Sequence, residues 1–132
     1  MIFIDSGPLL AKHLPDDQFH EKSLRLWQKI DSENLKCFTS NFVLNEFLTL
    51  LARRADYPFA CQKADLIFAS SRFSILRPDL KEELEALRFF KKYAGQKIGF
   101  TDCISFALMQ KHKISQVFSF DKHFEYAGFH LI

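Results

Sequence analysis

Short apolar runs alternate along the whole chain with segments of helical apolar spacing, and this alternation constrains the fold most strongly. The runs are too compact for helices and indicate strands at residues 2–4, 36–39, 72–76, 117–120 and 129–132. Helices are predicted between them at residues 18–31, 41–54, 58–70, 79–94 and 101–113, with helical turns starting after Asp5 and at Asp121. Strands that alternate with helices form a mostly parallel sheet covered on both faces. We therefore expect an α/β fold with three layers, in which helices cover both faces of a central sheet of about five strands (α/β/α).

Two of the predicted helices differ in how their apolar residues are distributed. The segment from Pro78-Asp79 to Gly95 is amphipathic, and its apolar stripe consists of Leu80, Leu84, Leu87 and Phe90. The segment 41–54 is apolar on nearly every side. We expect this second helix to be buried around most of its surface.

Length, cysteines and charge narrow the class of protein. A chain of 132 residues predicts one domain spanning residues 1–132. Its three cysteines are scattered without a C-x-x-C pair, which argues against a disulfide framework and favours a reducing compartment. The first residues do not resemble a signal peptide, and no apolar run approaches the length of a membrane-spanning helix. We expect a cytoplasmic protein with no membrane partner; the net charge of +2 alone says little about nucleic acid.

Three acidic residues lie where an α/β sheet binds its ligands. Asp5 ends the first predicted strand and Asp121 follows the fourth, so both belong at the carboxyl edge of the sheet. Asp102 begins a helix and reaches this edge only if the loop from Gly95 to Phe100 brings the chain back. Each of the three is equally suited to capping a helix, although the hydroxyls of Ser6 and Thr101 are alternative caps for two of these helices.

Glu46 is the most informative acid because it is the only charge in the apolar run from Phe42 to Leu51. It lies too deep in its helix to cap it. A buried carboxylate needs a cation or several hydrogen-bond donors. Arg53 lies two turns further along on the same helix face and is one source of charge. A metal ion that is shared with other nearby acids is a better source of positive charge.

Four carboxylates that converge predict a hard divalent cation. Oxygen-only ligands suit Mg²⁺ and Mn²⁺, and closely spaced carboxylates repel one another without such an ion. A bound ion of this kind orients and deprotonates water for attack on phosphorus. The sequence therefore predicts that Asp5, Glu46, Asp102 and Asp121 form a site that hydrolyses phosphodiester bonds.

The chain resembles the PIN domain family, and within it the VapC-type toxin ribonucleases. The resemblance covers essentially the whole chain and rests on the order and spacing of four elements: residues 2–10, residues 40–48, residues 101–107 and residues 119–121. It implies that Asp5, Glu46, Asp102 and Asp121 take the metal-site positions, and that Ser6 and Ser119 support them. It also implies Mg²⁺- or Mn²⁺-dependent endoribonuclease activity on RNA, a homodimer, and neutralisation by a cognate antitoxin.

The sequence departs from the family beside two of the acids, where Asn45 and Cys103 replace the basic residues that such toxins often carry. RNA contacts must then come from elsewhere, and proximity to the acids selects Lys12, Arg53, Arg54, Lys97 and Lys122. Of the five histidines, His123 is the exception, because it lies two residues from the site acid Asp121 and could contact a phosphate. The apolar helix at residues 58–70 is the predicted dimer surface.

Three other functions compete with the ribonuclease. A structure-specific DNA nuclease uses the same metal chemistry, but the chain has no added DNA-binding module. A receiver-like signalling domain has its acids in loops after strands, which does not fit Glu46 in mid-helix. A PIN-like module that binds RNA or protein without catalysis has no reason to retain four acids.

Overall fold

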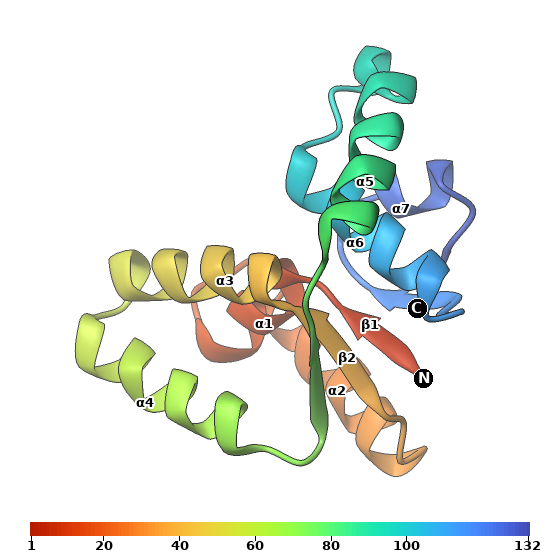
Figure 1. Cartoon of the computed structure of the whole chain (residues 1–132). Helices are drawn as coiled ribbons and strands as arrows, with labels where there is room; N and C mark the ends of the chain where they lie inside the picture. The colour runs from red at the N-terminus through yellow and green to blue at the C-terminus, as the bar shows by residue number, and fades with distance from the viewer.

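The computed structural model describes residues 1–132 and contains one five-stranded sheet (Figure 1). Its strands lie in the order β3-β2-β1-β4-β5, and every neighbouring pair is parallel. The strands are β1 (Ile2–Ile4), β2 (Cys37–Ser40), β3 (Phe73–Leu76), β4 (Gln116–Phe118) and β5 (His130–Leu131). This sheet confirms the predicted α/β class, and all five strands lie within or beside the predicted runs.

Helices connect the strands and cover the sheet on both sides. They are α1 (Ser6–His13), α2 (His20–Ser32), α3 (Asn41–Arg54), α4 (Tyr57–Ala69), α5 (Leu80–Lys92), α6 (Phe100–Lys111) and α7 (His123–Tyr126), with a 3-10 turn η1 at Ala94–Gln96. Helices α3 and α4 lie to one side of the sheet, and α5, α6 and α7 lie to the other (Figure 1). None of these helices has both the length and the apolar character that crossing a membrane requires.

The central strand β1 sets the position of the functional site. Ile2, Phe3 and Ile4 are fully buried, and the hydroxyl of Thr39 on β2 donates a hydrogen bond of 2.9 Å to the carbonyl oxygen of Ile4. The chain builds outward from β1 to β2 and β3 on one side, and to β4 and β5 on the other. The carboxyl ends of β1 and β4 are therefore adjacent at the switch in strand order, where parallel sheets bind ligands.

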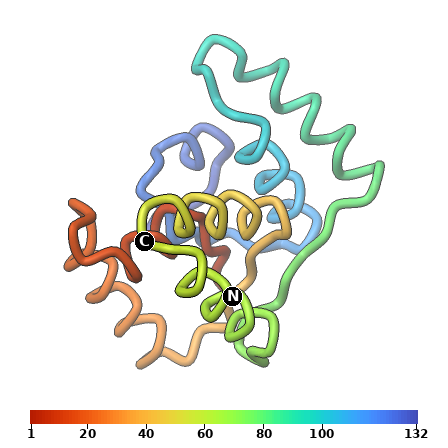
Figure 2. The backbone as a smooth tube through the Cα atoms, turned by 90° about the vertical axis from the view of Figure 1, so that its left-hand side faces the viewer, coloured from red at the N-terminus to blue at the C-terminus, as the bar shows by residue number.

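The apolar stripe of α5 does not face the core. Leu80 is 70% exposed and Leu84 is 54% exposed, whereas Glu82 and Ala86 on the opposite face are buried. The reason is that α6 already covers the sheet with an unbroken run of buried residues from Cys103 to Met109. Helix α5 packs mainly on α6 and forms an outer layer, visible in green at the edge of Figure 2.

The expectation that α3 is buried around most of its surface is wrong. Val43, Leu44 and Phe47 are buried, but Asn45 and Glu46 are exposed. Helix α3 contacts α1 on one side and α4 on another, and these contacts leave one face open to solvent. Glu46 is exposed, so its carboxylate does not have the desolvation penalty that was expected for a buried acid.

Candidate metal centre

Asp5 lies at the centre of the site, directly after β1. Its Oδ1 accepts a hydrogen bond of 2.8 Å from the backbone N–H of Ser6, and its Oδ2 accepts one of 2.7 Å from the Ser119 hydroxyl. Burial raises the pKa of Asp5 to about 6, the two hydrogen bonds oppose that rise, and the nearby charges of Glu46 and Asp121 add to it. Asp5 therefore caps α1, as one alternative predicted, and also presents its carboxylate to the other acids.

Ser119 joins Asp5 to the acid that follows β4. Its hydroxyl oxygen accepts a hydrogen bond of 3.0 Å from the backbone N–H of Asp121 while its own proton is directed at Asp5. Asp121 then accepts at Oδ1 from the backbone N–H of His123, at 2.9 Å. The ends of β1 and β4 are thus connected by side-chain hydrogen bonds as well as by the sheet.

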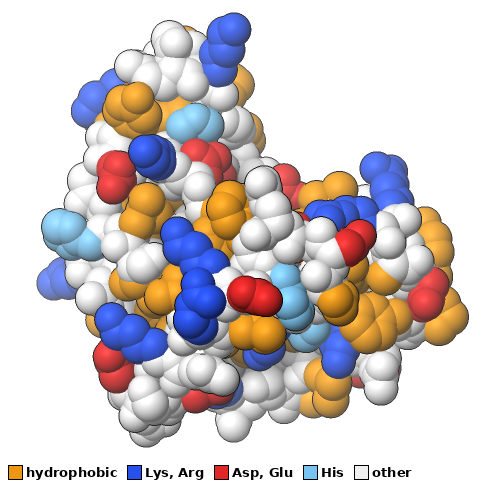
Figure 3. Space-filling view, turned by 180° about the vertical axis from the view of Figure 1, so that it is seen from behind, with side chains coloured by type: hydrophobic (Ala, Val, Ile, Leu, Met, Phe, Trp, Pro, Cys, Tyr) orange, Lys and Arg blue, Asp and Glu red, His pale blue; other side chains and the backbone are white.

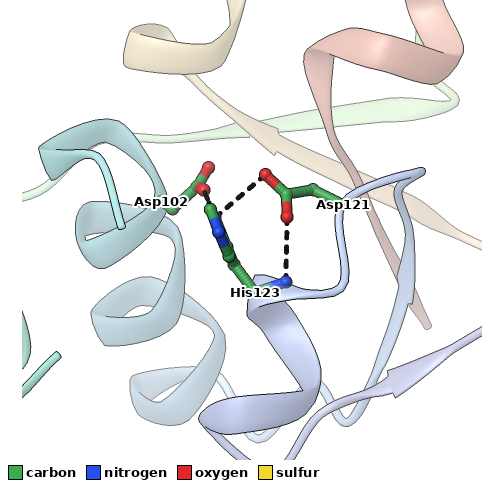
Figure 4. A group of neighbouring side chains, drawn as sticks. All are labelled: Asp102, Asp121 and His123. Atoms are coloured by element: carbon green, nitrogen blue, oxygen red, sulfur yellow. Dashed lines mark hydrogen bonds and ion pairs between the residues drawn. The ribbon is translucent and has the colours of Figure 1, made fainter. Parts of the chain in front are cut away.

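Asp102 reaches the same edge from the first turn of α6. The loop after η1 returns the chain to the carboxyl edge, as the sequence argument required. Nδ1 of His123 lies 3.3 Å from Oδ2 of Asp102 and 3.0 Å from Oδ2 of Asp121, so the imidazole stands between the two carboxylates (Figure 4). The pKa of Asp102 is raised to about 7 by burial, the largest cause, and by the charges of Asp5 and Asp121, while His123 opposes the rise.

Glu46 approaches the site from α3 through a hydroxyl. The Ser6 hydroxyl donates a hydrogen bond of 2.7 Å to Oε2 of Glu46, and the Ser6 N–H serves Asp5. One continuous network therefore runs through all six residues that the sequence argument selected for the site, with His123 as a seventh member. Its order is Glu46, Ser6, Asp5, Ser119, Asp121, His123 and Asp102.

The residues present fit a hard divalent ion. No lysine or arginine lies within 4.0 Å of any of the four carboxylates, including Arg53, which the sequence offered as a partner for Glu46. The one potential cation in contact with the acids is His123. Crowded carboxylates with raised pKa values and oxygen donors are the environment that Mg²⁺ or Mn²⁺ relieves. One ligand atom from each of Asp102, Asp121 and His123 lies within 4.8 Å of the others.

A polar crevice gives access to this network. It has a volume of about 890 Å³ and is lined by Asp5, Asp121 and His123 together with Lys122 and Tyr126, among others. On the face seen from behind, basic, acidic and apolar side chains are mixed, and basic side chains gather only in small groups (Figure 3).

The five basic residues selected for RNA contact lie at different distances from the crevice. Lys122 lines it, and Lys97 is exposed just after η1. Arg53 is exposed at the end of α3, where Arg54 pairs with Asp17 at 3.2 Å. Lys12 lies near the far end of α1 from Asp5, with Nζ 4.4 Å from the ring centroid of Trp27.

His123 is the member of the network whose contacts were only partly predicted from the sequence. Its separation of two residues from Asp121 was visible and suggested contact with a phosphate. Its approach to Asp102 was not visible, because that approach depends on how α7 folds back against α6.

Comparison with known proteins gives matches over nearly the whole chain. The model of the PIN domain family matches residues 2–130. The chain is 33% identical over 130 residues to VapC20 of two Mycobacterium tuberculosis strains, described as a 23S rRNA-specific endonuclease, covering 98% of this chain and 95% of VapC20.

Two solved structures have the same fold. The crystal structure of Mycobacterium tuberculosis VapC20, described as a toxin that cleaves the sarcin-ricin loop, superposes with a TM-score of 0.87 at 30% identity, covering 98% of this chain and 97% of that one. The crystal structure of FitAcB from Neisseria gonorrhoeae superposes with a TM-score of 0.72 at 18% identity, covering 100% and 96% of the two chains. The second similarity concerns the fold alone.

Proposed function

The chain belongs to the PIN domain family, and we propose that it is a metal-dependent endoribonuclease that hydrolyses phosphodiester bonds in RNA. The observation that carries this proposal is the network that joins four carboxylates beside a crevice lined by Asp5 and Asp121, with none of the four paired to lysine or arginine. Without a cation, four neighbouring carboxylates repel one another and destabilise the folded protein. This set of acids supports a proposal of catalysis over one of a module that only binds.

In this proposal some residues of the network bind the metal ion and others position its ligands. Asp5, Asp102 and Asp121 hold the Mg²⁺ or Mn²⁺ ion, and Glu46 contributes from the rim through the Ser6 hydroxyl. A bound divalent ion supplies an activated water and neutralises charge on the scissile phosphate. The hydroxyls of Ser6 and Ser119 fix the carboxylates that they contact.

Asp121 is the acid best placed to orient the attacking water. Its side chain is 42% exposed to the crevice, compared with 18% for Asp102. Because the 2′-hydroxyl of RNA is not consumed in this chemistry, the products carry a 5′-phosphate and a 3′-hydroxyl. Lys122 lines the same crevice and is placed to contact a phosphate.

We extend the proposal to ribosomal RNA on the basis of VapC20. That relative is described as a 23S rRNA-specific endonuclease and a toxin, and the similarity spans nearly the full length of both chains. By this likeness the substrate is a structured hairpin of large-subunit RNA, the cell is protected by a cognate antitoxin, and the enzyme acts in the cytoplasm. Its three unpaired cysteines suit that reducing compartment.

The homodimer predicted from the sequence is also part of the proposal, and we propose a different helix for its contact. The helix expected to mediate it, α4, turns Ala60 and Ile67 into the core. Helix α5 instead exposes Leu80, Leu84 and Leu87 at a spacing of four and three residues, which is the seam of a paired helix. We therefore assign the two-fold contact to α5.

The substrate is tested by incubating ribosomes and isolated 23S rRNA with the purified protein and Mn²⁺, then mapping cuts by primer extension. One discrete cut in a hairpin, absent with Asp5→Asn, is the expected result. A DNA nuclease would cut DNA of the same sequence as well or better. A binding module would retain the RNA without cutting it.

A further inference from the structure

We propose that His123 is itself a ligand of the divalent ion, and that its nitrogen makes the centre select Mn²⁺ over Mg²⁺. The proposal rests on the metal centre inferred above and adds a histidine to its protein ligands, together with a preferred ion. No metal role was predicted for any histidine from the sequence.

The first support is the spacing of the three ligand atoms. Two ligands at right angles, each about 2.1 Å from one cation, lie about 3.0 Å apart. Nδ1 of His123 lies 3.0 Å from Oδ2 of Asp121 and 3.3 Å from Oδ2 of Asp102. These two separations are close to that of neighbouring ligands in an octahedral shell, and the contributing oxygens of Asp102 and Asp121 lie within 4.8 Å of each other. Figure 4 shows the imidazole directed between the two carboxylates.

The second support is the way the histidine is held. Its backbone N–H donates to Oδ1 of Asp121, which orients that carboxylate so that Oδ2 faces the imidazole. The next residue, Phe124, is fully buried and anchors α7 in the core. The imidazole is thus positioned by the backbone, and its side chain remains 30% exposed in the crevice, where an ion can reach it.

The chemistry of the donor atom determines the preference. Mg²⁺ is bound almost entirely by oxygen atoms and gives up its bound water molecules reluctantly. Imidazole nitrogen binds first-row transition ions, whose affinities rise from Mn²⁺ through the series. A centre with three aspartates and one imidazole should therefore favour Mn²⁺ over Mg²⁺ more strongly than a centre of carboxylates alone.

The experiment measures binding of MnCl₂ and MgCl₂ separately, by calorimetry, to the wild type, His123→Ala, His123→Asp and the control His112→Ala. His112 is an exposed histidine at the end of α6. In His123→Ala we expect Mn²⁺ affinity to fall at least about tenfold and Mg²⁺ affinity to change much less. His123→Asp supplies an oxygen ligand, so it should bind Mg²⁺ at least as well as the wild type, and His112→Ala should behave as the wild type.

A histidine that only hydrogen-bonds to the acids gives a different result. Its removal would change the affinities for the two ions by the same factor, leaving their ratio unaltered, and that outcome overturns the proposal. Failure of wild-type protein to bind Mn²⁺ overturns it too.

Pulsed EPR on Mn²⁺-loaded protein with ¹⁵N-labelled histidine gives a readout independent of activity. A coupling from a directly bonded nitrogen is expected in the wild type and in His112→Ala, and its loss is expected in His123→Ala. If the wild type lacks this coupling, His123 is not a ligand. A protein that shows the coupling but cuts no RNA would refute the proposed function and leave this inference standing.

Discussion

The hydroxyl of Ser119 donates a hydrogen bond of 2.7 Å to Oδ2 of Asp5, although 114 residues separate the two in the sequence. The bond spans the carboxyl ends of β4 and β1, the two strands between which the order of the sheet reverses. It is one of two hydrogen bonds that hold the central carboxylate, and it opposes the rise that burial causes in the pKa of Asp5. We therefore expect Ser119 to contribute to both metal binding and stability.

Ser119→Ala should weaken Mn²⁺ binding about tenfold, because Asp5 loses the partner that orients it. It should also lower the free energy of unfolding by about 1–3 kcal/mol, because Oδ2 of Asp5 is left without a protein donor in a buried position. Calorimetry and urea unfolding measure the two effects. Ser115→Ala, at an exposed serine, is the matched control. Equal behaviour of the two variants would show that the bond between Ser119 and Asp5 is without consequence.

A divalent ion should raise the melting temperature of the wild type. At a concentration of about 100 times Kd, linkage adds about 2.7 kcal/mol, which corresponds to a shift on the order of 10 °C for a chain of this size. Asp5→Asn and Glu46→Gln should remove most of this shift, and in EDTA both variants should be at least as stable as the wild type, because a repelling charge is gone. Thermal unfolding with and without Mn²⁺ tests this. Strong destabilisation of Glu46→Gln in EDTA would instead make Glu46 a structural partner.

The metal-free protein should lose stability as the pH rises from about 4 to about 7. The pKa of Asp5 is raised to about 6 and that of Asp102 to about 7, so the folded state binds more protons than the unfolded state in this window. The contribution of these two groups is therefore largest below about pH 4 and is lost as the pH passes their folded pKa values. Melting temperatures in EDTA at several pH values measure the slope. Asp102→Asn should flatten it, and a slope unaffected by this substitution would contradict the assignment.

Leu84→Glu on α5 should convert the proposed dimer to a monomer, because it places a charge in the centre of the apolar seam. Leu66→Glu on α4 replaces another exposed leucine and should leave the dimer intact. Sedimentation of both variants at tens of micromolar protein, alongside the wild type, distinguishes the two helices. Dissociation by Leu66→Glu alone would return the interface to α4, and a monomeric wild type would defeat the dimer.

Local patterns in the sequence were sufficient for the strands, for most helix limits and for the grouping of the acids. Asp5 and Asp121 could be placed because a carboxyl end of a parallel strand has a known position in the fold. Asp102 needed one tertiary assumption, the return of the loop after Gly95, and Figure 1 shows that α6 does begin beside the sheet edge.

Properties that depend on layer order were not accessible from the sequence. The stripe of α5 has the spacing of a buried face, yet Leu80 and Leu84 are exposed because α6 occupies the sheet first. The burial of Glu46 was inferred from its apolar neighbours, but helix periodicity does not reveal that α1 and α4 leave its face open. The contact of His123 with Asp102 joins two elements whose packing no local pattern specifies.

Hydrolysis at a metal centre is tested most directly by analysing the ends that the purified protein leaves on RNA it has cut. We expect cleavage that leaves a 5′-phosphate and a 3′-hydroxyl, requires Mn²⁺ or Mg²⁺, and is abolished by EDTA. Cleavage should fall by orders of magnitude in Asp5→Asn, Asp102→Asn and Asp121→Asn, because each substitution removes a group from one cooperative site. Ends carrying a 2′,3′-cyclic phosphate, or cleavage indifferent to EDTA, would contradict hydrolysis at a metal centre.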